Sequence, residues 1–229
     1  MNNKLKKLLD YFYQKDFDCK IDTETGILFF SKTENDTKKC IQLDCKIKKE
    51  CIQLGPGITE YIEVDKVEKI LEQVTNKKTY FHYTISGTVN VERGGDLSEN
   101  FFIIKNESEL EAYVQLLDTY YNNYTLPFFK AIPTLQSFND KVLSVVSFDD
   151  YHNYLRGEIG LKAMIIMKLC NNSLYEKYIK YREEGFSNSP NLQNVESKFH
   201  QIVKKSFIEF NKLKEMFNRE NSLYINPSL

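Results

Sequence analysis

The sequence predicts an α+β fold, in which an N-terminal antiparallel sheet with two helices is followed by a C-terminal helical lobe packed around a buried helix near residues 160–170. Apolar residues alternate with polar ones through much of the first half, as in half-buried strands. Strand patterns nearly disappear after Asn106. Between Gly160 and Cys170 the only charges are Lys162 and Lys168, so a helix there must be covered on most sides. This stretch is shorter than the roughly 20 residues of a membrane span.

The first half is predicted to contain, in order, an amphipathic helix with Leu5, Leu8, Leu9 and Phe12, strands between Phe17 and Lys48, a stop at Gly55-Pro56-Gly57, a helix over Asp65–Val74, a strand over Tyr80–Val91, a turn at Gly94-Gly95-Asp96 and a strand over Phe101–Ile104. Ile41, Leu43 and Cys45 alternate with polar residues, which places one face of their strand in the core. We expect five or six strands, mostly antiparallel.

The second half is predicted to contain a helix capped by Ser108 and ended by Pro127, a helix over Pro133–Val145, a helix start at Ser147 with an S-x-x-[DE] capping box, the buried helix, a helix over Leu174–Glu184, a loop over Gly185–Asn194 and a last helix. The last long helix is predicted from an apolar stripe with steps of three, four and eight residues, made of Val195, Phe199, Ile202, Phe210, Leu213 and Phe217. Residues 1–105 would form a β-rich lobe and residues 106–229 a helical lobe. No flexible linker separates them, so we expect one continuous globular unit.

Charge and cysteine usage limit the partners and the compartment. The 229 residues include 31 Lys and Arg against 32 Asp and Glu, and neither half has the basic excess of a nucleic-acid-binding protein. The first residues lack the apolar segment of a signal peptide, and no stretch is long enough for a transmembrane helix. Five cysteines, an odd number, argue against a disulfide framework. We therefore expect a cytoplasmic protein without a membrane partner, and nucleic acid is not the favoured ligand.

Two segments contain residue types that could bind a metal or a cofactor. Cys40, Cys45 and Cys51, with Cys19, could suggest zinc, but they lack the C-x2-C pair of a zinc knuckle, and ordinary partly buried cysteines are favoured. Glu92–Asp96 contains two adjacent glycines without a nucleotide-binding motif, so a hairpin turn is favoured. We predict no metal and no cofactor.

A cleft between the lobes would be the setting for an enzyme or a small-ligand binder. Asp149, Asp150 and His152 form the only cluster of acidic residues with a histidine, although acidic residues after Ser147 also suit a helix start. His82 could act as an acid–base group near neutral pH, but no nucleophile motif accompanies it, and an exposed strand histidine is favoured. The sequence therefore names no catalytic residue.

Tyr175, Tyr178 and Tyr181 recur every three residues and are interleaved with basic residues that include Arg182. Tyr and Arg are enriched in protein interfaces, and aromatics with basic neighbours can also stack on single-stranded nucleic acid. Packing inside the fold is the favoured interpretation of part of this set. A protein interface is the favoured functional interpretation.

The order of elements resembles uncharacterised bacterial domains of unknown function, some of which are immunity partners in toxin systems. The segments that carry this resemblance are Glu107–Tyr124, Leu126–Phe129, Ser147–Tyr151, Leu161–Lys168 and Leu174–Tyr178. The resemblance implies a cytoplasmic binding protein and assigns no catalytic residue. The leading hypothesis is a non-enzymatic module that binds another protein, with the inter-lobe enzyme and a subunit that self-associates through its last helix as alternatives.

Overall fold

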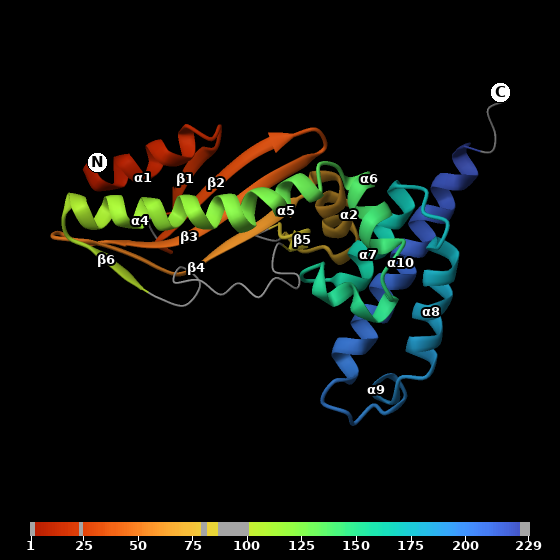
Figure 1. The fold of residues 1–229 in the computed structure, drawn as a ribbon. Coiled ribbons are helices and arrows are strands. Elements are labelled where there is room, and N and C mark those ends of the chain that lie inside the picture. Colours follow the sequence, from red (N-terminus) through yellow and green to blue (C-terminus); the bar gives the residue numbers. More distant parts are fainter. Residues whose placement is uncertain (1–2, 23–24, 79–81, 87–100, 225–229) are drawn as a thin grey trace.

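The structure is a computed structural model that describes residues 3–22, 25–78, 82–86 and 101–224. It has the predicted α+β architecture, with an N-terminal antiparallel sheet and C-terminal helices (Figure 1). The sheet and the helices that cover it form one end of the molecule, and the later helices form the other end.

The described strands form a six-stranded antiparallel sheet in the order β1-β2-β3-β4-β5, with β6 pairing with the opposite end of β4. The strands are β1 (Asp18–Asp22), β2 (Ile27–Glu34), β3 (Thr37–Ile47), β4 (Ile52–Glu63), β5 (Ile85–Ser86) and β6 (Phe102–Ile104). Most of the predicted Tyr80–Val91 strand and the predicted turn at Gly94-Gly95-Asp96 lie outside the described residues.

The prediction that Gly55-Pro56-Gly57 stops the sheet is wrong, because β4 continues through this segment. Pairing with β3 shifts register between Leu43 and Cys45 and then resumes. Gly55 and Gly57 have φ values of 89° and 86°, in a region that glycine enters without a steric penalty. The two glycines therefore let β4 form an irregularity within the strand instead of ending it.

Helices α1 (Asn3–Tyr13) and α4 (Glu107–Tyr120) pack against each other at the sheet. Phe12 of α1 stacks on Phe30 of β2 with ring centroids 3.7 Å apart. The N-cap of α4 is Asn106 in a capping box with Glu109, and not the predicted Ser108. Because α4 also contacts β6, it packs with the sheet although it follows residue 105.

Pro127 does not end this helix as predicted. A π-helical turn, Tyr121–Thr125, joins α4 to α5 (Leu126–Ala131), and Pro127 lies in the first turn of α5. Proline is tolerated in a first turn because its missing N–H is not needed there. The chain therefore stays helical from α4 to α5, as Figure 1 shows.

The remaining elements are α2 (Asp65–Thr75), α6 (Leu135–Phe138) with a π-helical turn (Asn139–Leu143), a 3-10 helix (Phe148–Asn153), α7 (Ile159–Leu169), α8 (Tyr175–Ser187), α9 (Pro190–Gln193) and α10 (His200–Tyr224). The predicted buried helix is confirmed, since all residues from Leu161 to Met167 in α7 are buried. Ser147 makes no side-chain capping bond, so the predicted capping box is wrong. The predicted loop from Gly185 is partly wrong, because α8 continues to Ser187.

A buried ion pair links α7 to α2. Lys162 Nζ lies 2.8 Å from Glu68 Oε1, and these side chains are 5% and 2% exposed. Lys162 also donates to the Tyr83 carbonyl oxygen at 2.6 Å, and Thr84 Oγ1 donates to Glu68 at 2.6 Å. These contacts anchor the central helix to the end of the sheet.

None of the described helices combines the length and apolar character that a membrane span requires.

Candidate functional site

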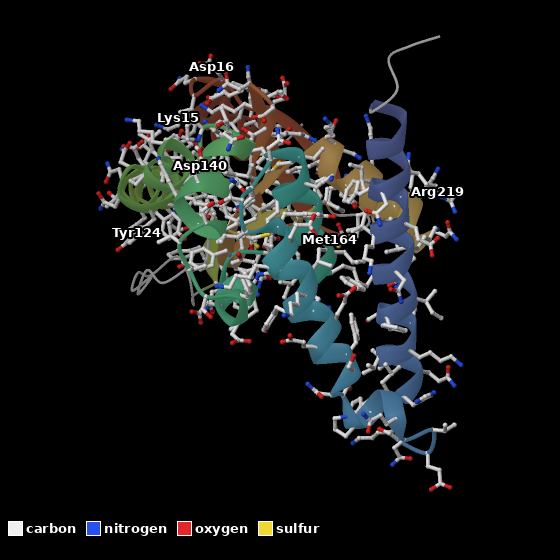
Figure 2. The ribbon with its side chains drawn as sticks, turned by 90° about the vertical axis from the view of Figure 1, so that its right-hand side faces the viewer. Lys15, Asp16, Tyr124, Asp140, Met164 and Arg219 are labelled. Carbon is white, nitrogen blue, oxygen red and sulfur yellow. The ribbon has the colours of Figure 1, made fainter. Side chains whose placement is uncertain are left out.

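Helices α8, α9 and α10 extend beyond the rest of the molecule, and we call residues 181–208 the arm. At a rise of 1.5 Å per residue, the 25 residues of α10 span about 37 Å, whereas the 11 residues of α7 span about 16 Å. Helix α10 therefore outruns the helix against which it packs. Figure 2 shows α8 and α10 converging away from the body, with Met164 of α7 between them at the level of the body.

The part of α10 that follows the arm packs into the body. Phe210, Leu213 and Phe217 are at most 1% exposed. Lys212 Nζ donates to the carbonyl oxygens of Gln73 and Val74 at the end of α2, at 2.8 Å each. This half of the predicted apolar stripe is confirmed.

The other half of the predicted stripe is wrong. Val195, Phe199 and Ile202 are 74%, 46% and 63% exposed, and we call these three residues the tip patch. Val195 and Phe199 precede α10, in the turn that follows α9. The described elements leave these side chains largely exposed, because the arm projects past α7 and the short helix α9 is what packs against this end of α10.

Internal contacts hold the arm together. Phe186 of α8 contacts Phe207 and Phe210 of α10, with ring centroids 5.2 and 5.4 Å apart. At the tip, Ser197 Oγ donates to Asn191 Oδ1 at 2.7 Å, so α9 is tied to the turn that carries the patch. The tip patch is therefore presented on a packed support.

A groove of about 400 Å³ lies between α8 and the start of α10, and its lining includes Tyr181, Arg182, Gly185, Phe186, Ser189 and Val203. Arg182 lies over the Phe186 ring, 5.0 Å from its centroid. The buried Nε of Arg182 has no hydrogen-bond partner among the described residues. On the side of α7, a Cβ added to Gly160 would lie 2.6 Å from Arg182 Cζ, so Gly160 gives the guanidinium its space.

The predicted tyrosine surface is only partly present. Tyr178 is buried at 2% exposure and donates to the Gly160 carbonyl oxygen at 3.3 Å, so it cannot contact a partner. Burial raises its pKa to about 12, which keeps the hydroxyl protonated. Tyr175 is half-buried, with Lys168 Nζ 5.0 Å from its ring centroid. Tyr181 and Arg182 are the two predicted binding residues that the structure brings together at the groove.

The residues predicted for a cleft have different neighbours and do not form one site. Asp149 accepts a hydrogen bond from Tyr181 Oη beside the arm, and His152 Nδ1 lies 2.6 Å from the Asp149 carbonyl oxygen. Asp150 is exposed on the same 3-10 helix. His82 instead lies near the sheet, where its ring nitrogens contact carboxylates of β4 and α2.

His82 is not the exposed strand histidine that the sequence favours. Its Nδ1 lies 3.1 Å from Glu63 Oε1, and its Nε2 lies 3.2 Å from Glu72 Oε1. Burial opposes its protonation, but the hydrogen bond to Glu63 and the surrounding carboxylates give a net increase in its pKa. Since an imidazole donates from both nitrogens only when protonated, this geometry suits the cation.

A second cavity, of about 170 Å³, lies between the lobes and is lined by Lys162, Glu68 and Arg156 among others. Burial lowers the pKa of Lys162 despite the opposing effect of Glu68. Lys162 and Glu68 satisfy each other, which makes this pair a structural link between α7 and α2 and not a free acid–base group.

The cysteines are free thiols, and Cys40 and Cys45 are buried. Within the described part of the chain, no three His, Cys, Asp or Glu side chains lie close enough together to hold a metal ion. Comparison with known proteins gives no family model that matches the chain, and no significant match to a curated protein or to a solved structure.

Proposed function

We propose that this protein is a non-enzymatic cytoplasmic module that binds another protein through its helical arm. The observation that carries this proposal is the tip patch, where three large apolar side chains that are close in the sequence are exposed. Apolar surface exposed on a folded protein is a common feature of interaction sites where its side chains gather into one patch. The patch is also at the end of a projection, where a partner can reach it from several sides.

The composition of the arm supports this role. Buried aromatic and Arg side chains supply much of the binding energy in protein interfaces. The arm carries Tyr181 and Arg182 on α8 and Phe199 in the turn before α10. A helical projection with an apolar end fits recognition in which a helix enters a groove of its partner. An immunity-type role, in which that partner is a toxin, is the specific form that the resemblance in the sequence suggests.

The cytoplasmic part of the proposal rests on the cysteines. All five are free, and Cys40 and Cys45 are buried in the sheet. Free thiols are typical of proteins in reducing compartments.

The test compares two variants of the full chain that are matched in residue type and exposure. Val195→Ser/Phe199→Ser alters the tip patch, where these residues are 74% and 46% exposed. Val145→Ser/Phe101→Ser is the control, because these residues are 72% and 55% exposed but lie outside the arm. Each variant and the unchanged protein would be used to capture partners from native cell extract at moderate salt, followed by mass spectrometry.

We expect the unchanged protein and the control to retain the same stoichiometric protein, and the tip variant to lose it by roughly tenfold or more, since two interface side chains can contribute over 1.4 kcal/mol. Equal retention by both variants would show that the arm is not the binding surface. Absence of any stoichiometric partner of the unchanged protein would contradict the binding role itself.

A further inference from the structure

The groove beside the tip patch contains a cation whose hydrogen-bonding capacity is unused. A guanidinium carries five N–H donors in a planar arrangement. The Nε of Arg182 is buried and has no acceptor among the residues that the structure describes. A buried donor without an acceptor is costly, and such a group is rare without a functional reason.

The neighbouring carboxylates are engaged elsewhere. Glu183 pairs with Lys214 of α10. Glu184, which lines the groove, lies 4.0 Å from Lys180, and Asp149 accepts from Tyr181 Oη. Arg182 therefore faces the groove without a described counterion.

Packing fixes the position of this guanidinium. The guanidinium lies against Gly160, where a Cβ would be only 2.6 Å from Cζ, and it also lies over Phe186, with Cζ 5.0 Å from the ring centroid. A guanidinium held in this way has lost rotamer freedom before a ligand arrives, and its fork matches the two oxygens of a carboxylate. The groove is therefore preorganised for a planar anion.

We propose that this groove binds the carboxylate of an acidic side chain from the partner protein, with Arg182 as its counterion. This proposal rests on the proposed function and names the chemistry of the partner. The apolar walls of the groove include Val203, whose N–H donates to the Phe199 carbonyl oxygen at 3.0 Å. The groove therefore adjoins the tip patch, and the partner segment combines an acidic residue with apolar neighbours.

The first experiment follows the Arg182 Nε–H resonance by NMR during a titration of the full chain with succinate at constant ionic strength. The resonance is assigned by its loss in Arg182→Lys, and sodium chloride is the control anion. We expect a saturable shift with succinate and none with chloride. No shift, or the same shift with chloride, would overturn the carboxylate site.

Gly160→Ala is the second variant, because it displaces the guanidinium without removing its charge. Alanine has a higher helix propensity than glycine, and the atoms that must move are the end of a flexible side chain, so the fold is kept. We expect Gly160→Ala to abolish the succinate shift at an unchanged melting temperature. A retained shift would show that the position of Arg182 against Gly160 does not matter and would overturn the preorganised site.

A capped peptide, acetyl-Leu-Glu-Ala-Phe-amide, tests whether the carboxylate comes from a protein. We expect it to bind roughly tenfold more tightly than succinate, since apolar contacts are added, and its Gln counterpart not to bind. Binding of succinate without binding of the peptide would overturn a partner side chain in favour of a free carboxylate. The variant Val195→Ser/Phe199→Ser leaves Arg182 in place, so it should still show the succinate shift even if it captures no partner. Loss of the shift in this variant would contradict the groove proposal, whereas loss of partner capture bears only on the proposed function.

Discussion

Two alanine substitutions in α10 test whether the tip patch is surface or core. Leu213 is completely buried, whereas Ile202 is 63% exposed. Both residues lie in the same helix, so backbone effects are similar. If the patch is a free surface, we expect Leu213→Ala to destabilise the protein strongly and Ile202→Ala to change its stability little.

The magnitudes follow from burial. Truncation of a fully buried Leu to Ala costs about 2–5 kcal/mol through lost transfer energy and the cavity left behind. Ile202 has only about a third of its surface buried, so truncation removes about 0.5–1 kcal/mol of the 1.5–3 kcal/mol for a fully buried side chain. The higher helix propensity of Ala offsets about 0.4 kcal/mol of this. The net effect at Ile202 is about 0.5 kcal/mol or less.

The assay is thermal unfolding followed by circular dichroism at two protein concentrations. For a chain of this size, 1 kcal/mol shifts the melting temperature by about 2–4 °C. Leu213→Ala should therefore lower it by about 4–20 °C and Ile202→Ala by about 2 °C or less. A comparable loss for Ile202→Ala would refute the reasoning, because Ile202 would then be packed. If that loss grows with protein concentration, the packing partner is a second copy of the chain.

Two further predictions concern charged groups near the lobe junction. Lys162→Met should cost about 3–5 kcal/mol in thermal or chemical unfolding, because it leaves Glu68 as an unpaired buried charge, and Lys162→Met/Glu68→Gln should recover part of that loss. Equal losses in the single and double variants would contradict this explanation. The pKa of His82 is raised in the folded state. Its contribution to stability is therefore fully present below its pKa in the unfolded chain, about 6.5, and is lost as pH rises through its pKa in the folded protein. The difference in melting temperature between the unchanged protein and His82→Gln should therefore shrink from pH 6 to pH 9. A difference that is constant with pH would show that the contacts with Glu63 and Glu72 do not depend on the charge of His82.

The elements with a strong local pattern could be predicted from the sequence. Leu5, Leu8 and Phe12 recur at helical spacing, and all three are buried in α1. The apolar stretch of α7 is likewise buried on all sides, because its side chains offer no polar face to water. In these cases the local pattern and the tertiary environment require the same structure.

Interruptions of regular structure could not be predicted in the same way. Gly55 and Gly57 lie inside a strand, and Pro127 lies inside a helical segment, although each residue type usually marks an end. What decides the outcome is pairing with β3 in the first case and the π-helical turn before α5 in the second. Both depend on partners that are distant in the sequence or on backbone geometry that no single residue specifies.

The arrangement of the residues proposed for binding could be predicted in part. Tyr181 and its neighbour Arg182 line the groove, but the spacing of three that singles out Tyr181 also includes Tyr178, which is buried. A helix turns by 100° per residue, so positions separated by three residues drift around it and meet different environments. The role of Gly160 was not predicted, because its contact with Arg182 joins two helices and leaves no local signal.

The apolar stripe of α10 shows why the tip patch was missed and why it matters. Phe199 and Phe210 are eleven residues apart, which is about three helical turns, so helical periodicity assigns both to one face. In the described part of the chain, α7 and α2 bury one end of the stripe, whereas the other end contacts the short helix α9 and stays partly exposed. The sequence does not show how far these covering elements extend. Apolar side chains are more stable away from water, which is why α7 lies in the core. Val195, Phe199 and Ile202 are apolar too, but they remain exposed to water. A segment of another protein that packs on α8 and α10 would complete the stripe in the way that α7 completes its other end.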